Sequence, residues 1–241
     1  MISHEFTDHM HKPTLLSLPP SIPVYATSKA YTAIKSWKHF SVVREIGRFD
    51  GDWRSTNPEA DGKEKSILPE WVGVSRVAYA GTDLLYYHSA IMICLPAPST
   101  TGQGEAGVAE GNGQEAEAIL YTPHGVTPQN ISPLISAIPP IRTLALIHGL
   151  QDISLNTITK AQLNLGAHNG LKVQRMLGAK YWIGTHDEVK KGGGVVSWFL
   201  DRKAIGLEEA VAKAKREGGL KGELEGVRFV DVGNGEQLVL E

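Results

Sequence analysis

Short apolar segments separated by polar turns recur along the chain and predict a series of short strands. Residues 71–79 alternate between large apolar positions and small or polar ones, as in a strand with one buried face. Residues 90–95 and 143–147 are apolar without interruption, which is typical of strands buried on both faces. Four further strands are predicted, over residues 24–26, 41–46, 119–121 and 181–183.

Helices are predicted between several of these strands, over residues 13–18, 28–37, 169–177 and 207–217. Pro13 suits the first position of a helix, Asn169 can cap the start of another, and Gly178 suits its end. Residues 227–240 predict a hairpin around residues 233–235, Gly-Asn-Gly. This alternation predicts an α/β protein in which helices cover the outside of sheets.

A low-complexity segment interrupts the pattern over residues 96–118. It is rich in Gly, Glu, Ala, Ser and Thr and contains almost no large apolar side chain. Such a composition cannot bury enough apolar surface to offset the entropy of folding, so we expect a disordered surface insertion. Strand-like sequence resumes at Ile119, which places the insertion between two strands. We therefore predict that residues 1–241 form a single domain.

Charge and composition narrow the classes of partner. The 241-residue chain has a formal net charge of −2 and scattered basic residues, so we expect neither nucleic acid nor a membrane as a partner. No run approaches the ~20 apolar residues of a transmembrane helix, and no secretory signal pattern is visible. The single cysteine, Cys94, lies in an apolar run, where a buried and unreactive thiol is expected. These features predict a cytoplasmic protein.

Residue types that bind metal ions are concentrated at the N-terminus. His4, Asp8 and His9 fall within six positions, directly after a short segment compatible with a strand. Imidazole and carboxylate groups suit zinc, iron or manganese. A metal site is therefore the first functional hypothesis.

Three predicted strands also run into a histidine: His124, His148 and His186. Active sites of open α/β sheets gather at strand ends, so the repetition is more informative than any one of these residues. Gly125 and Gly149 follow two of them and permit sharp turns and close approach of the backbone. Each histidine alone would be read as an ordinary structural residue, but together with the N-terminal group they favour a metal site.

The segment His4-Glu5-Phe6-Thr7-Asp8-His9 resembles the His-x-His-x-Asp-His signature of the metallo-β-lactamase superfamily, with Phe6 in place of the second histidine. Residues 177–187 resemble the superfamily's last motif, in which a helix, an Ala-Lys turn and a strand lead to a histidine ligand. Residues 119–125 resemble the strand that ends in Gly-Asp, with His124 at the position of the Asp. The resemblance implies an αββα sandwich, nearest to the lactonase-like and phosphodiesterase-like branch, over most of the chain.

By this resemblance, one of the superfamily's two metal sites is incomplete. Phe6 removes one ligand, and the strand over residues 71–79 has no histidine at its end, since His88 comes several residues later. The second site keeps four candidate ligands: Asp8, His9, His124 and His186. The resemblance therefore implies one ion, zinc or else iron or manganese, with His4 as a further ligand or a proton shuttle.

These ligands imply a metal-dependent hydrolase that cleaves an ester, lactone or phosphoester bond of a small-molecule substrate. The metal would activate water, and Asp8 and His4 are the candidate catalytic residues, with Asp8 orienting or deprotonating this water. The alternative is a catalytically inactive relative that acts as a binding or scaffold protein, which the missing ligands favour. A metal-binding regulator is a third hypothesis.

The chain begins only one or two residues before the motif, whereas the superfamily has strands ahead of it. We therefore expect a sandwich that lacks its N-terminal strands. Three explanations follow: a fragment, a shortened paralogue without activity, or a complete chain in which a homo-oligomer covers the missing strands.

Other polar residues are weaker candidates. His168 precedes a predicted helix and is placed to face a substrate. Asp187 and Glu188 either orient a ligand histidine or are simply solvated. Residues 190–194, Lys-Lys-Gly-Gly-Gly, lack the strand–loop–helix surroundings of a phosphate-binding loop and predict a flexible turn.

Overall fold

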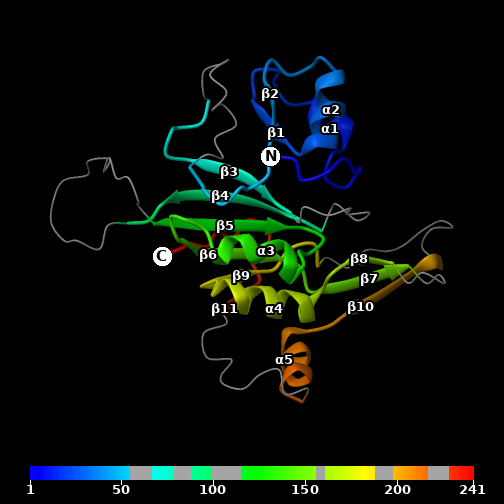
Figure 1. Cartoon of the computed structure of the whole chain (residues 1–241). Helices are drawn as coiled ribbons and strands as arrows, with labels where there is room; N and C mark the ends of the chain where they lie inside the picture. The colour runs from blue at the N-terminus through cyan, green and yellow to red at the C-terminus, as the bar shows by residue number, and fades with distance from the viewer. Residues whose placement is uncertain (55–66, 79–87, 99–114, 156–160, 188–197, 217–227) are drawn as a thin grey trace.

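A computed structural model describes residues 1–54, 67–78, 88–98, 115–155, 161–187, 198–216 and 228–241. Its largest element is a six-stranded sheet in the order β11-β9-β6-β5-β4-β3 (Figure 1). The bounds of these strands are β3 Gly73–Val77, β4 Ala90–Pro96, β5 Ala116–Thr122, β6 Ile141–His148, β9 Tyr181–Ile183 and β11 Arg228–Val230. Strands β5, β6, β9 and β11 are parallel, whereas β3 and β4 join the sheet antiparallel.

Helices α3 (Pro128–Ile135) and α4 (Ala167–Leu177) cover one face of this sheet (Figure 1). The core between the sheet and these helices contains Met92 of β4 and Leu120 of β5, both fully buried. They belong to the same apolar cluster as Ile131 of α3 and Val173 of α4. A further helix, α5 (Leu207–Arg216), contacts α4 on its outer side. The apolar faces predicted for these strands and helices therefore meet in one layer.

A smaller sheet covers part of the opposite face. It pairs β1 (Val24–Ala26) with β2 (Val43–Glu45) in parallel, beside helices α1 (Lys12–Leu16) and α2 (Ser28–Ser36). Tyr25 of β1 packs against Val74 and Ile91 of the large sheet. The two neighbours of Tyr25, Val24 and Ala26, point the other way and pack against α2. The layers are thus helix, small sheet, large sheet and helices, which confirms the predicted αββα sandwich.

A third sheet, which the sequence pattern did not predict, extends from the side of the sandwich (Figure 1). It is antiparallel, in the order β10 (Leu200–Ala204), β7 (Gln151–Leu155) and β8 (Gln162–Asn164). Its strands are short and mostly polar, so no apolar run marks them in the sequence, unlike the equally short β1 and β9.

Several element boundaries differ from the predictions. The hairpin over residues 227–240 was a wrong prediction, because β11 pairs in parallel with β9 and residues 231–241 form a turn without a second strand. Helix α4 follows Gly166, so Asn169 lies in its first turn and is not its cap. The last part of the predicted insertion belongs to β5, where small side chains let Ala116 and Ala118 become fully buried. The remainder, residues 99–114, lies outside the described residues.

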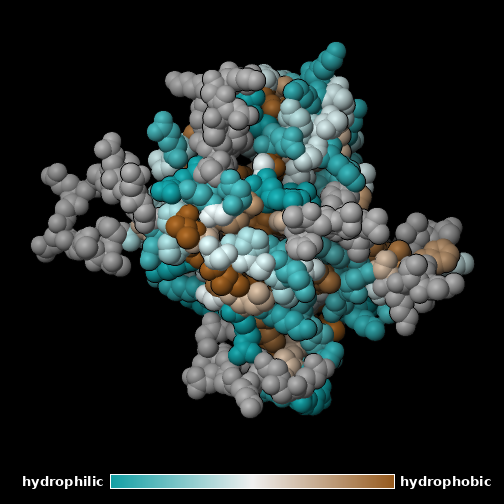
Figure 2. Space-filling view, in the orientation of Figure 1, coloured by the Kyte–Doolittle hydropathy of each residue, from teal (hydrophilic) through white to brown (hydrophobic). Residues whose placement is uncertain are grey.

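The described surface is mixed in character. Figure 2 shows apolar patches interspersed with polar ones on the face that carries α3 and α4. Cys94 is buried, as predicted, and burial raises the pKa of its thiol to about 12. Among the helices that the structure describes, none has the length and apolar character needed to cross a membrane.

The packing of the large sheet predicts a sharp contrast between two leucines. Leu120→Ala should lower the free energy of unfolding by about 2–5 kcal/mol, because it opens a cavity in the fully buried layer under α3. The matched change Leu95→Ala, at an exposed position of neighbouring β4, should cost about 0.5 kcal/mol or less. Urea unfolding of both variants measures the two values, and equal losses would contradict this description of the core.

Candidate metal centre

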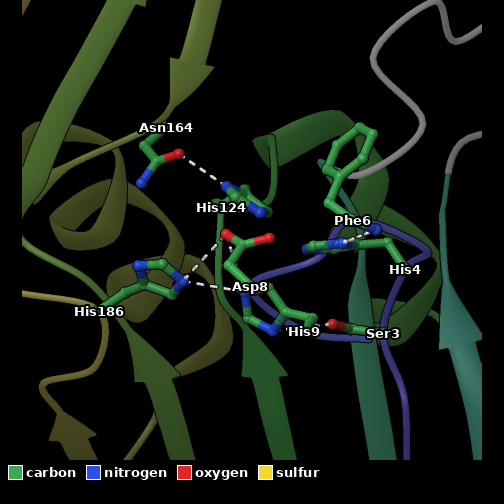
Figure 3. Close-up of polar contacts among 8 residues, drawn as sticks. All are labelled: Ser3, His4, Phe6, Asp8, His9, His124, Asn164 and His186. Carbon is green, nitrogen blue, oxygen red and sulfur yellow. Dashed lines mark hydrogen bonds and ion pairs between the residues drawn. The ribbon is translucent and has the colours of Figure 1, made fainter. Parts of the chain in front are cut away.

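The N-terminal motif is held against the small sheet. The Ile2 N–H donates to the Tyr25 carbonyl at 2.8 Å, and the Thr27 N–H donates to the Ile2 carbonyl at 3.1 Å. The chain then turns tightly, because the His9 N–H donates to the Phe6 carbonyl at 2.9 Å. This turn brings the side chains of His4, Asp8 and His9 to the same region (Figure 3).

His124 and His186 arrive from the large sheet, at the carboxyl ends of the parallel strands β5 and β9. The turn after His124 needs a glycine, as predicted. Gly125 has a φ of +81°, and a Cβ there would lie 2.5 Å from the Cβ of Leu165. Gly149 is equally confined, since its Cβ would lie 2.6 Å from the Thr185 carbonyl oxygen.

The backbone of His186 is strained. Its φ is +64°, a backbone conformation that residues other than glycine adopt at a cost of about 1–3 kcal/mol. The next residue holds it there: the Asp187 carboxylate accepts the backbone N–H groups of Leu150 at 2.6 Å and Gln151 at 3.0 Å. Asp187 therefore anchors the loop of His186 to β7, a role that differs from both predicted ones. Glu188 lies outside the described residues.

Three ligand-type atoms converge at the centre of the site. His9 Nε2 and His186 Nε2 are 2.9 Å apart, and Asp8 Oδ2 lies 3.7 Å from the first and 3.8 Å from the second (Figure 3). A second, overlapping group combines His9 with His4 and His124, whose ligand atoms lie within 4.8 Å of one another. All five residues predicted as metal ligands thus meet, with His9 shared between the two groups.

Hydrogen bonds define which ring nitrogens face the centre. His124 Nδ1 lies 2.7 Å from Asn164 Oδ1, so Nδ1 carries the proton and Nε2 carries the lone pair. In His4 the pattern is reversed, because the Phe6 N–H donates to Nδ1 at 3.3 Å. The neutral ring of His4 then carries its proton on the buried Nε2, which makes no hydrogen bond with any described residue. This tautomer suits a proton donor better than a ligand.

Burial and mutual repulsion control the charges. The pKa of His4 is lowered to about 3, first by burial and then by the neighbouring His9 and His124 rings. Burial by itself would raise the pKa of Asp8, but His9, a backbone hydrogen bond and other histidines outweigh it, so this pKa is lowered. Near neutral pH the site therefore holds a carboxylate and a neutral His4.

His148 does not join the cluster, although it ends strand β6 between the other two. It is fully buried in the interior, where its Nδ1–H donates to the Gly149 carbonyl at 2.6 Å and its Nε2 accepts from Asn169 at 3.1 Å. Its pKa is lowered to about 4, mainly by burial. His88 is also buried and its Nε2 contacts the Leu163 carbonyl at 3.1 Å, so it does not replace the missing ligand.

Phe6 stands at the motif position of a histidine, and its side chain lines a pocket. Its ring points away from Asp8 (Figure 3) and forms part of a pocket of about 250 Å³ beside the cluster. Asp8, His124, Asn164 and His186 line this pocket on the side of the candidate ligands. Apolar residues and Arg202 of the third sheet line its other side. These residues and Asn164 were not predicted from the sequence, because no pattern marked β7, β8 and β10.

The remaining candidates lie apart from the cluster. His168 lies in the first turn of α4 and is half-buried. His39 contacts the Leu18 carbonyl, and His11 contacts Thr14. Residues 190–194 lie outside the described residues.

No protein-family model and no curated protein matches the chain. An isothiocyanate hydrolase from Delia radicum gut bacteria superimposes with a TM-score of 0.53 at 11% identity, covering 99% of this chain and 76% of that one. A possible metal-dependent hydrolase from Veillonella parvula aligns with a TM-score of 0.48 at 12% identity, covering 95% and 71%. The chain therefore has the fold of the first of these hydrolases.

The buried position of His148 predicts a specific pH dependence of stability. Because its pKa is lower folded than unfolded, the unfolded chain takes up a proton first, and stability falls as the pH drops from about 6.5 to about 4. His148→Gln removes this contribution of at most about 3 kcal/mol. The free-energy difference between the two proteins should therefore be smaller at pH 4.5 than at pH 7 in urea unfolding. An unchanged difference would contradict the low pKa.

Proposed function

We propose that this protein is a metal-dependent hydrolase of the metallo-β-lactamase type, whose ion is held by Asp8, His9 and His186 with His124 beside them. The observation that carries the proposal is the separation of the first three ligand atoms, 2.9 to 3.8 Å. Ligand atoms around one tetrahedral zinc ion lie about 3.3 Å apart, since each bond is about 2.0–2.1 Å long. The residues therefore fit one ion.

The donor set also has the chemistry that a divalent ion requires. One carboxylate and three imidazoles suit zinc, iron or manganese. The lowered pKa values keep Asp8 ionised and His4 neutral near neutral pH, so no protonated imidazolium of His4 opposes the charge of a metal ion. The Asn164 side chain fixes the His124 ring so that its lone pair lies on Nε2.

The chain's own residues have distinct roles in such a hydrolase. A bound ion would supply Lewis acidity and lower the pKa of a water molecule. Asp8, half-exposed at the pocket, is placed to orient that water and accept its proton. His4, with its proton on Nε2, is placed to donate a hydrogen bond toward the same centre. The bond cleaved is proposed to be an ester, lactone or phosphoester.

A non-catalytic binding or scaffold protein is the competing proposal, and Phe6 favours it. Phenylalanine cannot ligate a metal, and its ring packs against His4 and points away from Asp8 (Figure 3). The second group, His4, His9 and His124, gains no ligand from residue 6 and contains no carboxylate. This reading predicts a protein that folds without metal, so metal content separates the two proposals.

Elemental mass spectrometry of the purified chain should find about one equivalent of zinc, iron or manganese. His9→Ala and His186→Ala should each remove most of it, because each deletes one of the three closest ligand atoms. His39→Ala is the matched control and should retain the metal, since His39 contacts the Leu18 carbonyl instead. A folded protein with no bound metal would support the scaffold proposal.

Asn164 provides a second test through its contact with His124. Asn164→Leu removes the acceptor for the His124 Nδ1–H and should weaken metal binding about 10- to 100-fold. Asn164→Asp keeps an oxygen acceptor at that position and should retain affinity. Competition with a chromophoric chelator measures both constants, and equal affinities for the leucine and aspartate variants would exclude this positioning role.

A further inference from the structure

The third sheet forms a wall of the pocket opposite the candidate metal ligands. Its register places Arg202 of β10 directly opposite Ile153 of β7, and Ile153 opposite Asn164 of β8. Side chains that are directly opposite in an antiparallel pair project from the same face. Leu200, two residues before Arg202, shares that face. All four line the pocket.

The polarity of these four side chains changes from one end of the pocket wall to the other. At one end Asn164 contacts His124, so this end adjoins the candidate metal centre. Ile153 of the central strand β7 forms the apolar middle, and Leu200 adds apolar surface beside Arg202 on β10. At the other end Arg202 contributes the positive charge of the pocket lining. Over the part of the chain that the structure describes, no carboxylate forms an ion pair with Arg202, whereas neighbouring Lys203 pairs with Asp201 at 3.6 Å.

The distances along this row define the shape of a ligand. Strands in a sheet lie about 4.8 Å apart, so Arg202 is about 10 Å from Asn164 across the wall. A substrate with its scissile bond at the ligand cluster would lay an apolar chain over Ile153 and bring its far end to Arg202, with Leu200 beside that end. A guanidinium at that end binds a planar carboxylate through two parallel hydrogen bonds.

We propose that the pocket selects esters that carry a carboxylate several carbons from the scissile bond, and that Arg202 binds this carboxylate. This inference rests on the proposed hydrolase function for the reaction, but the recognition itself does not require the metal. One guanidinium among apolar neighbours balances a single negative charge, which favours a monoanionic carboxylate over a phosphate dianion.

Monomethyl adipate and dimethyl adipate are suitable probes, because they share one methyl ester and the same carbon chain and differ at the far end, a charged carboxylate in one and a neutral methyl ester in the other. Calorimetry on the full chain after chelator treatment should show at least about tenfold tighter binding of the monoester. Arg202→Gln should abolish this preference while leaving diester binding unchanged. Lys203→Gln is the matched control. The Lys203 side chain carries the adjacent positive charge but projects from the opposite face of β10, so this variant should keep the preference for the monoester. Circular dichroism checks that each protein is folded.

The same pair of esters, tested as substrates of the protein as purified, separates the two proposals. One outcome supports both the hydrolase function and the role of Arg202. In it the protein turns over the monoester, and Arg202→Gln raises the KM for the monoester about tenfold with little change in kcat. Turnover of both esters with no difference in KM, or an equal loss of preference in Lys203→Gln, overturns the role of Arg202 and leaves the hydrolase standing. Selective binding without turnover supports carboxylate recognition and counts against the hydrolase.

Discussion

Burial of closely packed imidazole rings is the constraint on which the site depends. The ring of His4 has its centroid 4.2 Å from that of His9 and 4.6 Å from that of His124, and all three are largely removed from water. Burial lowers the pKa of His4 to about 3, and repulsion from the neighbouring His9 and His124 rings adds to that effect. Neutral rings beside an ionised Asp8 present lone pairs and negative charge, the environment that a divalent cation complements.

The αββα sandwich keeps these groups together because they come from both of its sheets. The N-terminal segment is fixed to β1 through Ile2, whereas His124 and His186 follow strands of the large sheet. Packing of Tyr25 between the sheets therefore holds the two halves of the site in register. The strained backbone of His186 shows that local preference yields to this arrangement, with Asp187 supplying the hydrogen bonds that maintain it.

Much of this could be predicted from the sequence, because it depends on local patterns. The apolar runs located most strands of the large sheet, and the five predicted ligands come from one short motif and two strand ends. His148 shows the limit of that reasoning, since a histidine at the end of β6 looks the same in sequence whether its ring points to the site or to the interior. The third sheet escaped prediction because its strands are short and acquire their function only through pairing, which brings Asn164 and Arg202 to one wall.

The central claim is that one ion binds among Asp8, His9 and His186, and its position is the most direct measurement. A crystal grown with zinc and recorded at the zinc absorption edge should show one anomalous peak about 2.0–2.2 Å from Asp8 Oδ2, His9 Nε2 and His186 Nε2. A peak elsewhere, or no peak while these three side chains keep the arrangement described, would contradict the account.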